Sequence, residues 1–140
     1  MRYVLDTDVV IVAMRSPSGA SAAILAAAME GAVTLVVNVP LALEYEATCS
    51  VAEHRLAAGL AEREVQAFLD GLVALAEPVQ SHFLWRPRLR DPDDEMVLEA
   101  AVNGRADAIV TFNIRHFGDV PREFGVLLPN PADALSRLRS

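Results

Sequence analysis

Residues 3–10 have the sequence YVLDTDVV, in which a short apolar run stops at an acid. Continuous apolar runs are typical of strands that are buried on both faces of a parallel sheet, whereas half-exposed strands alternate apolar and polar residues. Val9 to Met14 then predict a short helix, which ends before the turn at residues 16–19. The segment therefore predicts a buried strand and a helix, with Asp6 at their junction.

The same alternation continues along the chain. Strands are predicted at 3–5, 33–37, 108–111 and 126–128, an extended segment at 79–85, and helices at 9–14, 21–30, 41–46, 61–76, 93–103 and from 131. Asn38 offers a cap for the third of these helices, Pro40 lies in its first turn, and Asn103-Gly104 ends the fifth. Strands that alternate with helices predict an α/β fold, with a central, mainly parallel sheet flanked by helices on both faces. A length of 140 residues predicts a single domain, 1–140.

The composition excludes several classes of protein. With 53% hydrophobic and 22% charged residues the chain is no disordered tail, and its single cysteine, Cys49, excludes an internal disulfide and a cysteine-rich zinc fold. The formal net charge of −7 has the wrong sign for binding nucleic acid by bulk charge alone. Every basic residue is an arginine, so no lysine amine is available as a nucleophile or phosphate ligand.

No part of the sequence predicts a membrane segment. The N-terminal residues carry one basic side chain and their apolar run is soon broken by acids, which does not resemble a secretory signal. No apolar run approaches the roughly 18 residues that cross a bilayer. We therefore expect a soluble, cytoplasmic protein with no membrane partner.

Three acids stand where apolar sequence stops. Asp6 follows the first strand, Glu44 lies in the first turns of an apolar helix, and Asp94 opens another helix. Carboxylates without histidine or thiolate partners suit Mg²⁺ or Mn²⁺ better than Zn²⁺. Each acid also has a structural explanation: a cap or strand-end turn, a solvent-facing residue, and a first-turn acid favoured by the helix dipole.

Two asparagines are predicted at the same edge of the sheet as Asp6. Asn38 follows the second strand, and Asn113 lies just past the strand that ends at Thr111. In open parallel sheets, ligands bind outside the carboxyl ends of the strands. The sequence therefore places several oxygen ligands at one edge.

Four segments resemble the motifs of PIN-domain ribonucleases, in the family's order. They are VLDTDV at 4–9, NVPLALEY at 38–45, DPDD at 91–94 followed by VLEAA at 97–101, and ADAIVTFN at 106–113. The resemblance spans positions 4–117, most of the chain. The Asp-Pro-Asp-Asp form is typical of a PIN subgroup of toxins from toxin–antitoxin pairs, related to the VapC type. The resemblance implies a three-layer PIN-like fold.

The resemblance also implies which side chains act. Asp6, Glu44 and Asp94 match the family's metal-binding acids, and Asn113 lies at a fourth catalytic position. Asn113 offers a carbonyl oxygen but no negative charge. Asp8 stands where asparagine is common and adds charge to the same edge.

The fourth motif departs from the family's pattern. Many members have Thr-x-Asn/Asp-x-x-Asp-Phe, whereas residues 111–117 are TFNIRHF, with His116 at the place of the last acid. Asp91 and Asp107 are secondary candidates for the site. A turn before a strand explains Asp107 better than ligation does.

By resemblance, the expected activity is hydrolysis of RNA phosphodiesters by a Mg²⁺- or Mn²⁺-dependent endoribonuclease. The cation would polarise a phosphate oxygen and activate a water, so no side chain forms a covalent bond. The protein would be the toxin of a type II toxin–antitoxin pair. Its expected partners are the RNA substrate, a cognate antitoxin that occludes the pocket, and a second copy in a homodimer.

An acidic ribonuclease needs local positive charge to hold its substrate. The predicted substrate-binding cluster is Arg86, Arg88 and Arg90. Arginines can clamp phosphates, and Trp85 can stack on a base. An edge strand whose arginines pair with the acids that follow explains the same segment. Arg15 and Arg115 are the alternative phosphate ligands.

Two other functions fit parts of the sequence. Asp6-Thr7-Asp8 is similar to the opening of haloacid-dehalogenase-like phosphatases, but those enzymes generally hold the phosphoryl group with a basic residue, usually lysine, and have longer chains. Because His116 and Asn113 replace acids, a catalytically degenerate PIN domain that only binds RNA or a protein is the other alternative.

Overall fold

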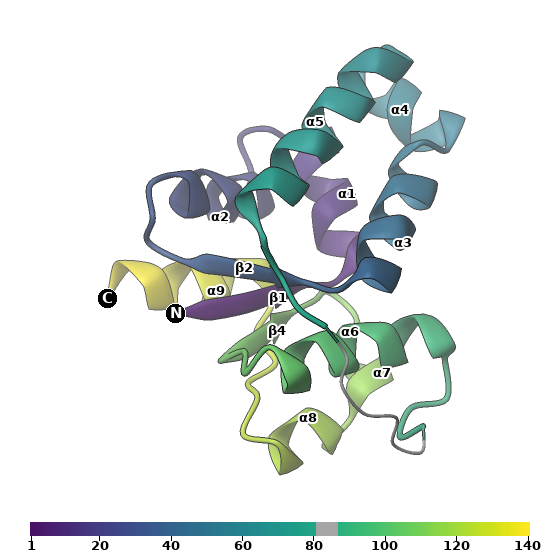
Figure 1. The fold of residues 1–140 in the computed structure, drawn as a ribbon. Coiled ribbons are helices and arrows are strands. Elements are labelled where there is room, and N and C mark those ends of the chain that lie inside the picture. The colour runs from purple at the N-terminus through teal and green to yellow at the C-terminus, as the bar shows by residue number, and fades with distance from the viewer. Residues whose placement is uncertain (81–86) are drawn as a thin grey trace.

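A parallel sheet lies between helices in the computed structural model, which describes residues 1–80 and 87–140 (Figure 1). In these residues the strands are β1 (Arg2–Leu5), β2 (Thr34–Val37), β3 (Glu77–Pro78) and β4 (Ala108–Val110), in the order β3-β2-β1-β4. Every neighbouring pair is parallel, and Tyr3 of β1 lies opposite both Leu35 and Ala108. The predicted α/β class with a central parallel sheet is confirmed.

Helices cover both faces of the sheet. They are α1 (Thr7–Arg15), α2 (Ala20–Met29), α3 (Val39–Cys49), α4 (Ala52–Ala58), α5 (Glu62–Leu75), α6 (Pro92–Asn103), α7 (Ile114–Phe117), α8 (Val120–Glu123) and α9 (Pro131–Arg139). Helices α1 to α5 lie on one side of the sheet, α6 to α8 lie on the other, and α9 packs against α2 (Figure 1). The chain therefore forms the expected three layers.

Side-chain caps start the helices that frame the site. The Asp6 carboxylate accepts a hydrogen bond from the backbone N–H of Thr7 (2.8 Å), and Asn38 Oδ1 accepts one from Leu41 (3.0 Å). Pro40 lies in the first turn of α3, as predicted. Such caps satisfy backbone donors that have no partner within the helix. Asp6 and Asn38 thus begin helices at the carboxyl ends of β1 and β2.

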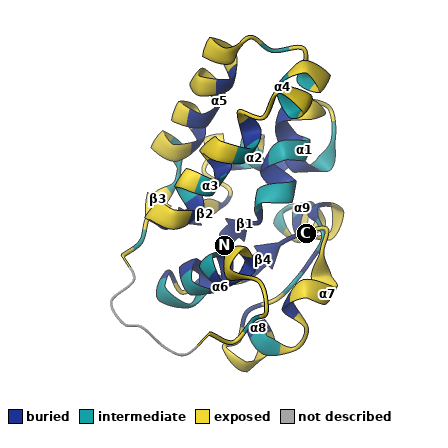
Figure 2. Ribbon diagram, turned by 90° about the vertical axis from the view of Figure 1, so that its right-hand side faces the viewer, coloured by how far each residue is buried: buried dark blue, intermediate teal, exposed yellow. Residues whose placement is uncertain are grey.

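The core consists of the three longer strands and the inner faces of the helices (Figure 2). Its largest fully buried side chains are Tyr3, Phe117, Leu5, Ile24, Leu41, Leu98 and Ile109. The outer faces of α4 and α5 are exposed (Figure 2). Burial of both faces of the strands explains why their sequences are continuously apolar.

Gly104 ends α6 where the helix meets the sheet. A Cβ atom built at this position would lie 2.4 Å from Cγ1 of Val36 and 2.7 Å from the carbonyl oxygen of Ala100. The Gly104 carbonyl oxygen also accepts hydrogen bonds from the Arg2 guanidinium. Only glycine fits this close approach, and the predicted end of the helix at Asn103-Gly104 is confirmed.

Some elements differ between the prediction and the structure. Residues 126–128 form no named strand but only a parallel bridge between Leu127 and Ala108, since Pro129 and Pro131 follow and lack backbone donors. Helix α4 was not predicted because it has no buried residue and hence no apolar stripe. Of the extended segment 79–85, residues 81–85 lie outside the described part of the chain.

Within the described residues, no single helix is long and apolar enough to span a membrane. Helices α1 and α2 together have the length and apolar composition of a span, but a bend of 95° separates them.

Candidate active site

The strand order places a crevice at the carboxyl ends of β1 and β4. From β1 the chain moves outward through β2 to β3 and then returns to the other side of β1 as β4. Such a reversal of strand order opens a crevice that ligands commonly occupy. The backbone N–H of Asp6 donates to the carbonyl oxygen of Val110 (2.9 Å), which joins the two strand ends there.

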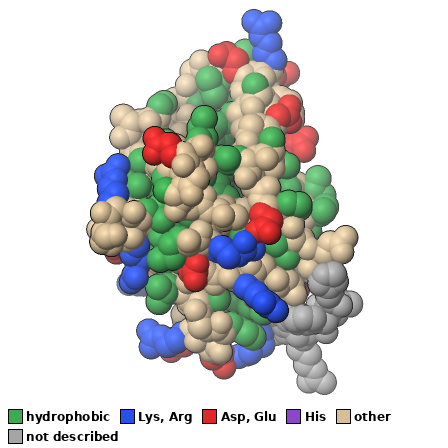
Figure 3. Space-filling model, turned by 60° about the vertical axis from the view of Figure 1, so that its left-hand side comes forward, with side chains coloured by type: hydrophobic (Ala, Val, Ile, Leu, Met, Phe, Trp, Pro, Cys, Tyr) green, Lys and Arg blue, Asp and Glu red, His purple; other side chains and the backbone are tan. Residues whose placement is uncertain are grey.

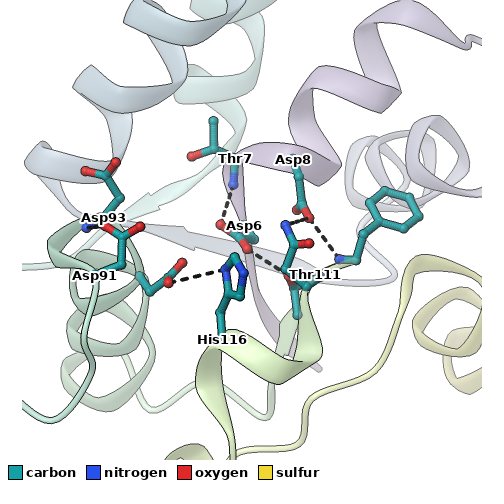
Figure 4. A network of polar contacts seen from close by, with 10 residues as sticks. Asp6, Thr7, Asp8, Asp91, Asp93, Thr111 and His116 are labelled. Carbon is teal, nitrogen blue, oxygen red and sulfur yellow. Dashed lines mark hydrogen bonds and ion pairs between the residues drawn. The ribbon is translucent and has the colours of Figure 1, made fainter.

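Asp6 lies at the centre of a polar network at this crevice (Figure 4). Its second carboxylate oxygen, Oδ2, accepts a hydrogen bond from Oγ1 of Thr111 at 2.7 Å. The side chain is buried, and burial raises its pKa, although the hydrogen bonds from Thr111 and Thr7 oppose that shift. A buried carboxylate with a raised pKa favours any partner that brings positive charge.

Asp94 approaches Asp6 from the first turn of α6. It is buried, and its Oδ2 lies 3.5 Å from Nδ1 of His116 in α7. Burial, and next the charges of Asp6 and Asp91, raise the pKa of Asp94 to about 6. Asp91 caps α6 by accepting a hydrogen bond from the backbone N–H of Asp93 (2.9 Å). Two of the three predicted metal-binding acids therefore lie near enough for the charge of one to raise the pKa of the other.

Asp8 and Asn113 join α1 to the loop after β4. Oδ2 of Asp8 accepts hydrogen bonds from the backbone N–H of Phe112 and from Nδ2 of Asn113, both at 3.0 Å. The other oxygen, Oδ1, is buried and has no hydrogen-bond partner among the described residues. Burial and the charge of Asp6 raise the pKa of Asp8 to about 6. The predicted catalytic position Asn113 thus binds Asp8 through its amide nitrogen.

Glu44 is not part of this network. It is half-buried on α3, where its Oε1 accepts a hydrogen bond from Oγ1 of Thr48 at 3.0 Å. Within residues 1–80 and 87–140, no hydrogen bond or ion pair joins it to Asp6 or Asp94. Its role as a metal ligand stays a prediction.

Both polar atoms of the Asn38 side chain form structural contacts. Its Oδ1 caps α3, and its Nδ2 donates to the carbonyl oxygen of Met96 (3.2 Å).

The donors at the crevice suit a hard divalent cation. They are the oxygens of Asp6 and Asp94, whose pKa values are raised, together with Oδ1 of Asp8, which none of the described residues contacts by a hydrogen bond. In the described part of the chain, no three His, Cys, Asp or Glu side chains are grouped closely enough to hold a metal ion by themselves. Mg²⁺ keeps several waters and commonly takes only one or two carboxylates. Asp6 and Asp94 therefore fit Mg²⁺ or Mn²⁺ and not a metal that needs a closed set of protein ligands.

The predicted arginine cluster divides into different environments. Arg88 forms an ion pair with Glu123, and its guanidinium lies 5.9 Å from the centroid of the Phe124 ring. Arg90 is exposed and lines an open pocket of about 400 Å³ with Asp91, Asp94, Arg115 and His116. Arg115, predicted as an alternative phosphate ligand, therefore lines the same pocket as Arg90. The predicted residues Arg86 and Trp85 lie outside the described residues.

Comparison with known families gives a match to the PIN domain over residues 2–115. The chain belongs to the PIN domain family. A search of curated proteins finds no match. The fold of this PIN domain is similar to a chain in the crystal structure of VapBC2 from Rickettsia felis bound to a DNA fragment from their promoter, with a TM-score of 0.63 and 17% sequence identity. The match covers 93% of this chain and 98% of that chain, and at this identity it shows the fold alone.

Other candidates in this PIN domain have structural roles. Asp107 accepts a hydrogen bond from the backbone N–H of Arg2 (2.7 Å) at the start of β1, away from the crevice. Arg15 lies 3.1 Å from Nδ1 of His54, between α1 and α4. The buried Tyr45 donates from its hydroxyl to the carbonyl oxygen of Leu5, and burial raises its pKa well above the ordinary value. The contact of Asp107 agrees with the structural explanation given for it from the sequence.

Two supporting residues of the PIN site were not assigned roles from the sequence. Thr111 bonds Asp6 and also accepts from the backbone N–H of Asn113 at 2.9 Å. Glu95, next to Asp94, accepts from the backbone N–H of Leu89 at 2.8 Å and thereby fixes the segment before Arg90. The position of Thr111 at the end of a predicted strand could have indicated its role. Nothing in the sequence indicates the role of Glu95, because an acid in the first turn is common in any helix.

Proposed function

We propose that this PIN domain is a Mg²⁺- or Mn²⁺-dependent endoribonuclease and the toxin of a type II toxin–antitoxin pair, acting in the cytoplasm as one domain of residues 1–140. PIN domains are nucleases, so family membership supports phosphodiester hydrolysis. The observation that carries the proposal is the pair of buried acids Asp6 and Asp94, which lie near enough at the crevice for the charge of Asp6 to raise the pKa of Asp94. The VapBC2 fold match is consistent with a toxin.

Asp6 and Asp94 would hold the cation, and Glu44 is proposed as a further ligand through a rotated side chain or a water. A bound divalent cation supplies polarisation of a phosphate oxygen and lowers the pKa of a water. The chain's own residues fix the geometry: Thr7 and Thr111 orient Asp6, and the start of α6 carries Asp94. Burial of these acids excludes water and strengthens the electrostatic attraction of a cation.

The direct test is cleavage of a structured RNA by the purified protein. We expect cleavage with Mg²⁺ or Mn²⁺ and none with EDTA. A folded protein that binds RNA without cutting it in either ion would support the degenerate binding module instead. Hydrolysis of a small phosphomonoester through an aspartyl-phosphate would support the phosphatase, an alternative that gains nothing from the family match.

Arg90 and Arg115 are the proposed phosphate ligands. Both are exposed and line the pocket that contains Asp94, whereas Arg88 is engaged by Glu123. Arg86 keeps the role predicted from the sequence, as a proposal. Two guanidiniums beside a cation site are suited to binding the phosphates of single-stranded RNA. Each such contact adds about 0.7 to the slope of log affinity against log salt concentration.

We predict that changing both Arg90 and Arg115 to alanine weakens binding of a single-stranded RNA about tenfold and lowers the slope of log affinity against log salt concentration by about 1.4. Fluorescence anisotropy with labelled RNA at several salt concentrations measures both quantities. Alanine at the exposed Arg63 and Arg139 is the matched control, because it removes the same charge elsewhere. An unchanged slope in the pocket variant would place the RNA on a different surface.

An apolar groove offers a site for the antitoxin. Residues of α2 and α5 line a depression of about 500 Å³. They include Leu25, Met29, Phe68, Leu72 and Leu75. Hydrophobic side chains gather among scattered charges on the face that brings the left-hand side of Figure 1 forward (Figure 3). We propose that an apolar segment of the antitoxin lies here while another part of it occludes the pocket at Asp94, and that the homodimer uses another face.

We predict that Met29→Glu weakens binding of a co-expressed antitoxin at least about tenfold, because a buried, unpaired carboxylate costs more than 1 kcal/mol at an interface. Met29 is 77% exposed, so the free protein should stay folded. Leu56→Glu on α4, at a side chain that is 66% exposed outside the groove, is the control. Equal affinities of the two variants by calorimetry would move the antitoxin away from α2 and α5.

A further inference from the structure

An exposed aromatic side chain lies at the edge of the crevice. Phe112 follows the end of β4 and is 49% exposed, whereas Phe117 in the next helix is buried. The residue before it, Thr111, bonds Asp6 through its hydroxyl. A large ring is therefore open to solvent next to the residues that hold the central acid.

The backbone around Phe112 is fixed by hydrogen bonds. Its own N–H donates to Oδ2 of Asp8 (3.0 Å). The N–H of Asn113 donates to Oγ1 of Thr111 (2.9 Å), and the N–H of Thr111 donates to the carbonyl oxygen of Pro129 (3.2 Å). An aromatic side chain on a fixed backbone loses little conformational freedom on binding, which favours contact with a flat ligand.

The ring and the proposed phosphate ligands belong to different sides of the crevice. Phe112 is bonded to Asp8, whereas the pocket that contains the two exposed arginines is lined by His116. Figure 4 shows Asp8 and His116 on different sides of Asp6. A strand of nucleic acid that crosses the crevice would therefore meet the arginines on one side and the ring on the other.

Charge alone does not account for binding of RNA at this crevice. Asp8 and Asp94 both lie near enough to Asp6 to be affected by its charge, and the formal net charge of the chain is −7. The exposed Arg90 and Arg115 offset only part of this negative charge. Stacking of a nucleobase on an aromatic ring needs no charge and accepts every base.

We propose that Phe112 stacks on an unpaired nucleobase of the RNA that enters this crevice, and that this contact makes the protein prefer single-stranded to duplex RNA. In a duplex, neighbouring base pairs cover the faces of each base, so the ring has no face to contact. The proposal rests on the proposed nuclease function, since it names the form of RNA that the same crevice takes.

Phe112→Ala in the full-length protein, with EDTA present, tests the contact apart from cleavage. A labelled single-stranded RNA should bind at least about fivefold more weakly than it binds the wild type. A duplex that contains the same strand should bind within about twofold of the wild type. The slope of log affinity against log salt concentration should stay unchanged, because no charge is removed. Fluorescence anisotropy measures all three quantities.

Leu127→Ala is the matched control. Leu127 is 45% exposed and forms a bridge with Ala108 at the start of β4, the end of that strand away from the crevice. Its removal takes away a similarly exposed apolar side chain and should leave both affinities unchanged.

Phe112→Trp gives a second measurement that does not require removal of the ring. The aromatic face is kept, so this variant should bind single strands at least as tightly as the wild type. Combined with Trp85→Phe, it leaves one indole in the chain. Single-stranded RNA should quench the fluorescence of that indole, and duplex RNA should not.

Cleavage by the wild type in Mg²⁺ or Mn²⁺ separates this proposal from the proposed function. If the wild type cuts RNA but Phe112→Ala keeps wild-type affinity for single strands, the stacking contact is overturned and the nuclease stands. If Phe112→Ala loses affinity for single strands alone and the wild type cuts nothing, the contact stands and the nuclease fails. Equal losses for single strands and duplexes would show that the ring supports the loop and not a base, which overturns the contact.

Discussion

Asp94→Asn should lower the rate of divalent-dependent RNA cleavage at least about a hundredfold, because losing a metal ligand costs more than losing its supporting residues, which is worth about 10–100-fold. Asp94 is buried beside Asp6 and keeps its place in α6 when its charge is removed, so the helix should stay folded. Asp6→Asn should lower the rate to the same extent, because it removes the charge of the other proposed ligand. The fold should be kept, since asparagine still caps α1 and accepts the hydrogen bond from Thr7. Steady-state cleavage of a labelled RNA in Mg²⁺ and in Mn²⁺ measures both variants.

Asp93→Asn is the matched control for this experiment. Asp93 lies in the same first turn of α6 but is exposed, so its removal changes the helix dipole interaction to a similar extent without touching the crevice. Its activity should stay within about twofold of the wild type. Asp94→Asn with wild-type cleavage would remove this residue from the list of ligands.

The metal-free protein should lose stability as the pH rises from about 4 to about 6, through the charges at the crevice. The pKa of Asp94 is raised from 3.8 to about 6, and that of Asp8 likewise. The folded chain therefore binds these protons more tightly than the unfolded chain does. The stability that the protonated forms of Asp94 and Asp8 contribute is greatest below the unfolded pKa of 3.8. It falls as the pH rises towards the folded pKa of about 6 and changes no further above that value.

Urea unfolding in EDTA measures this effect when the wild type and Asp94→Asn are compared. The two proteins should have nearly equal free energies of unfolding near pH 4. At about pH 7.5 Asp94→Asn should be more stable by about 1–2 kcal/mol: a shift of about two pKa units corresponds to about 3 kcal/mol, and solvent screening at the open pocket reduces this figure. Excess Mg²⁺ should stabilise the wild type and close this gap, because the ion binds only where both carboxylates remain. A variant that is less stable than the wild type at pH 7.5 without metal would mean that the Asp94 charge stabilises the fold.

The backbone framework of the site could be predicted from sequence, for a simple reason. Apolar runs that end at Asp6 and Thr111 predict parallel strands, and the carboxyl ends of parallel strands meet at one edge. The asparagine cap of α3 and the start of α6 follow from local patterns near Asn38 and Asp91. Local sequence therefore determines which residues begin each element of the crevice.

Side-chain partners across the fold could not be predicted in this way. The pairing of Arg88 with Glu123 depends on how α8 packs beyond the sheet, and the contact of Asn113 with Asp8 joins residues 105 positions apart. The direction of Glu44 depends on the rotation of α3 about its axis, which is set by tertiary packing. Such contacts depend on how the elements pack in the folded protein, and the spacing of residues in the sequence does not predict them.

The pairing of β1 with β4 determines when the two sides of the crevice come together during synthesis. Asp6 is translated 105 residues before its partner Thr111. Because domains fold as units, a growing chain on the ribosome has only one side of the crevice until β4 has emerged and docked. Under the proposed function, a nascent chain therefore could not cut the messenger that encodes it before β4 is in place.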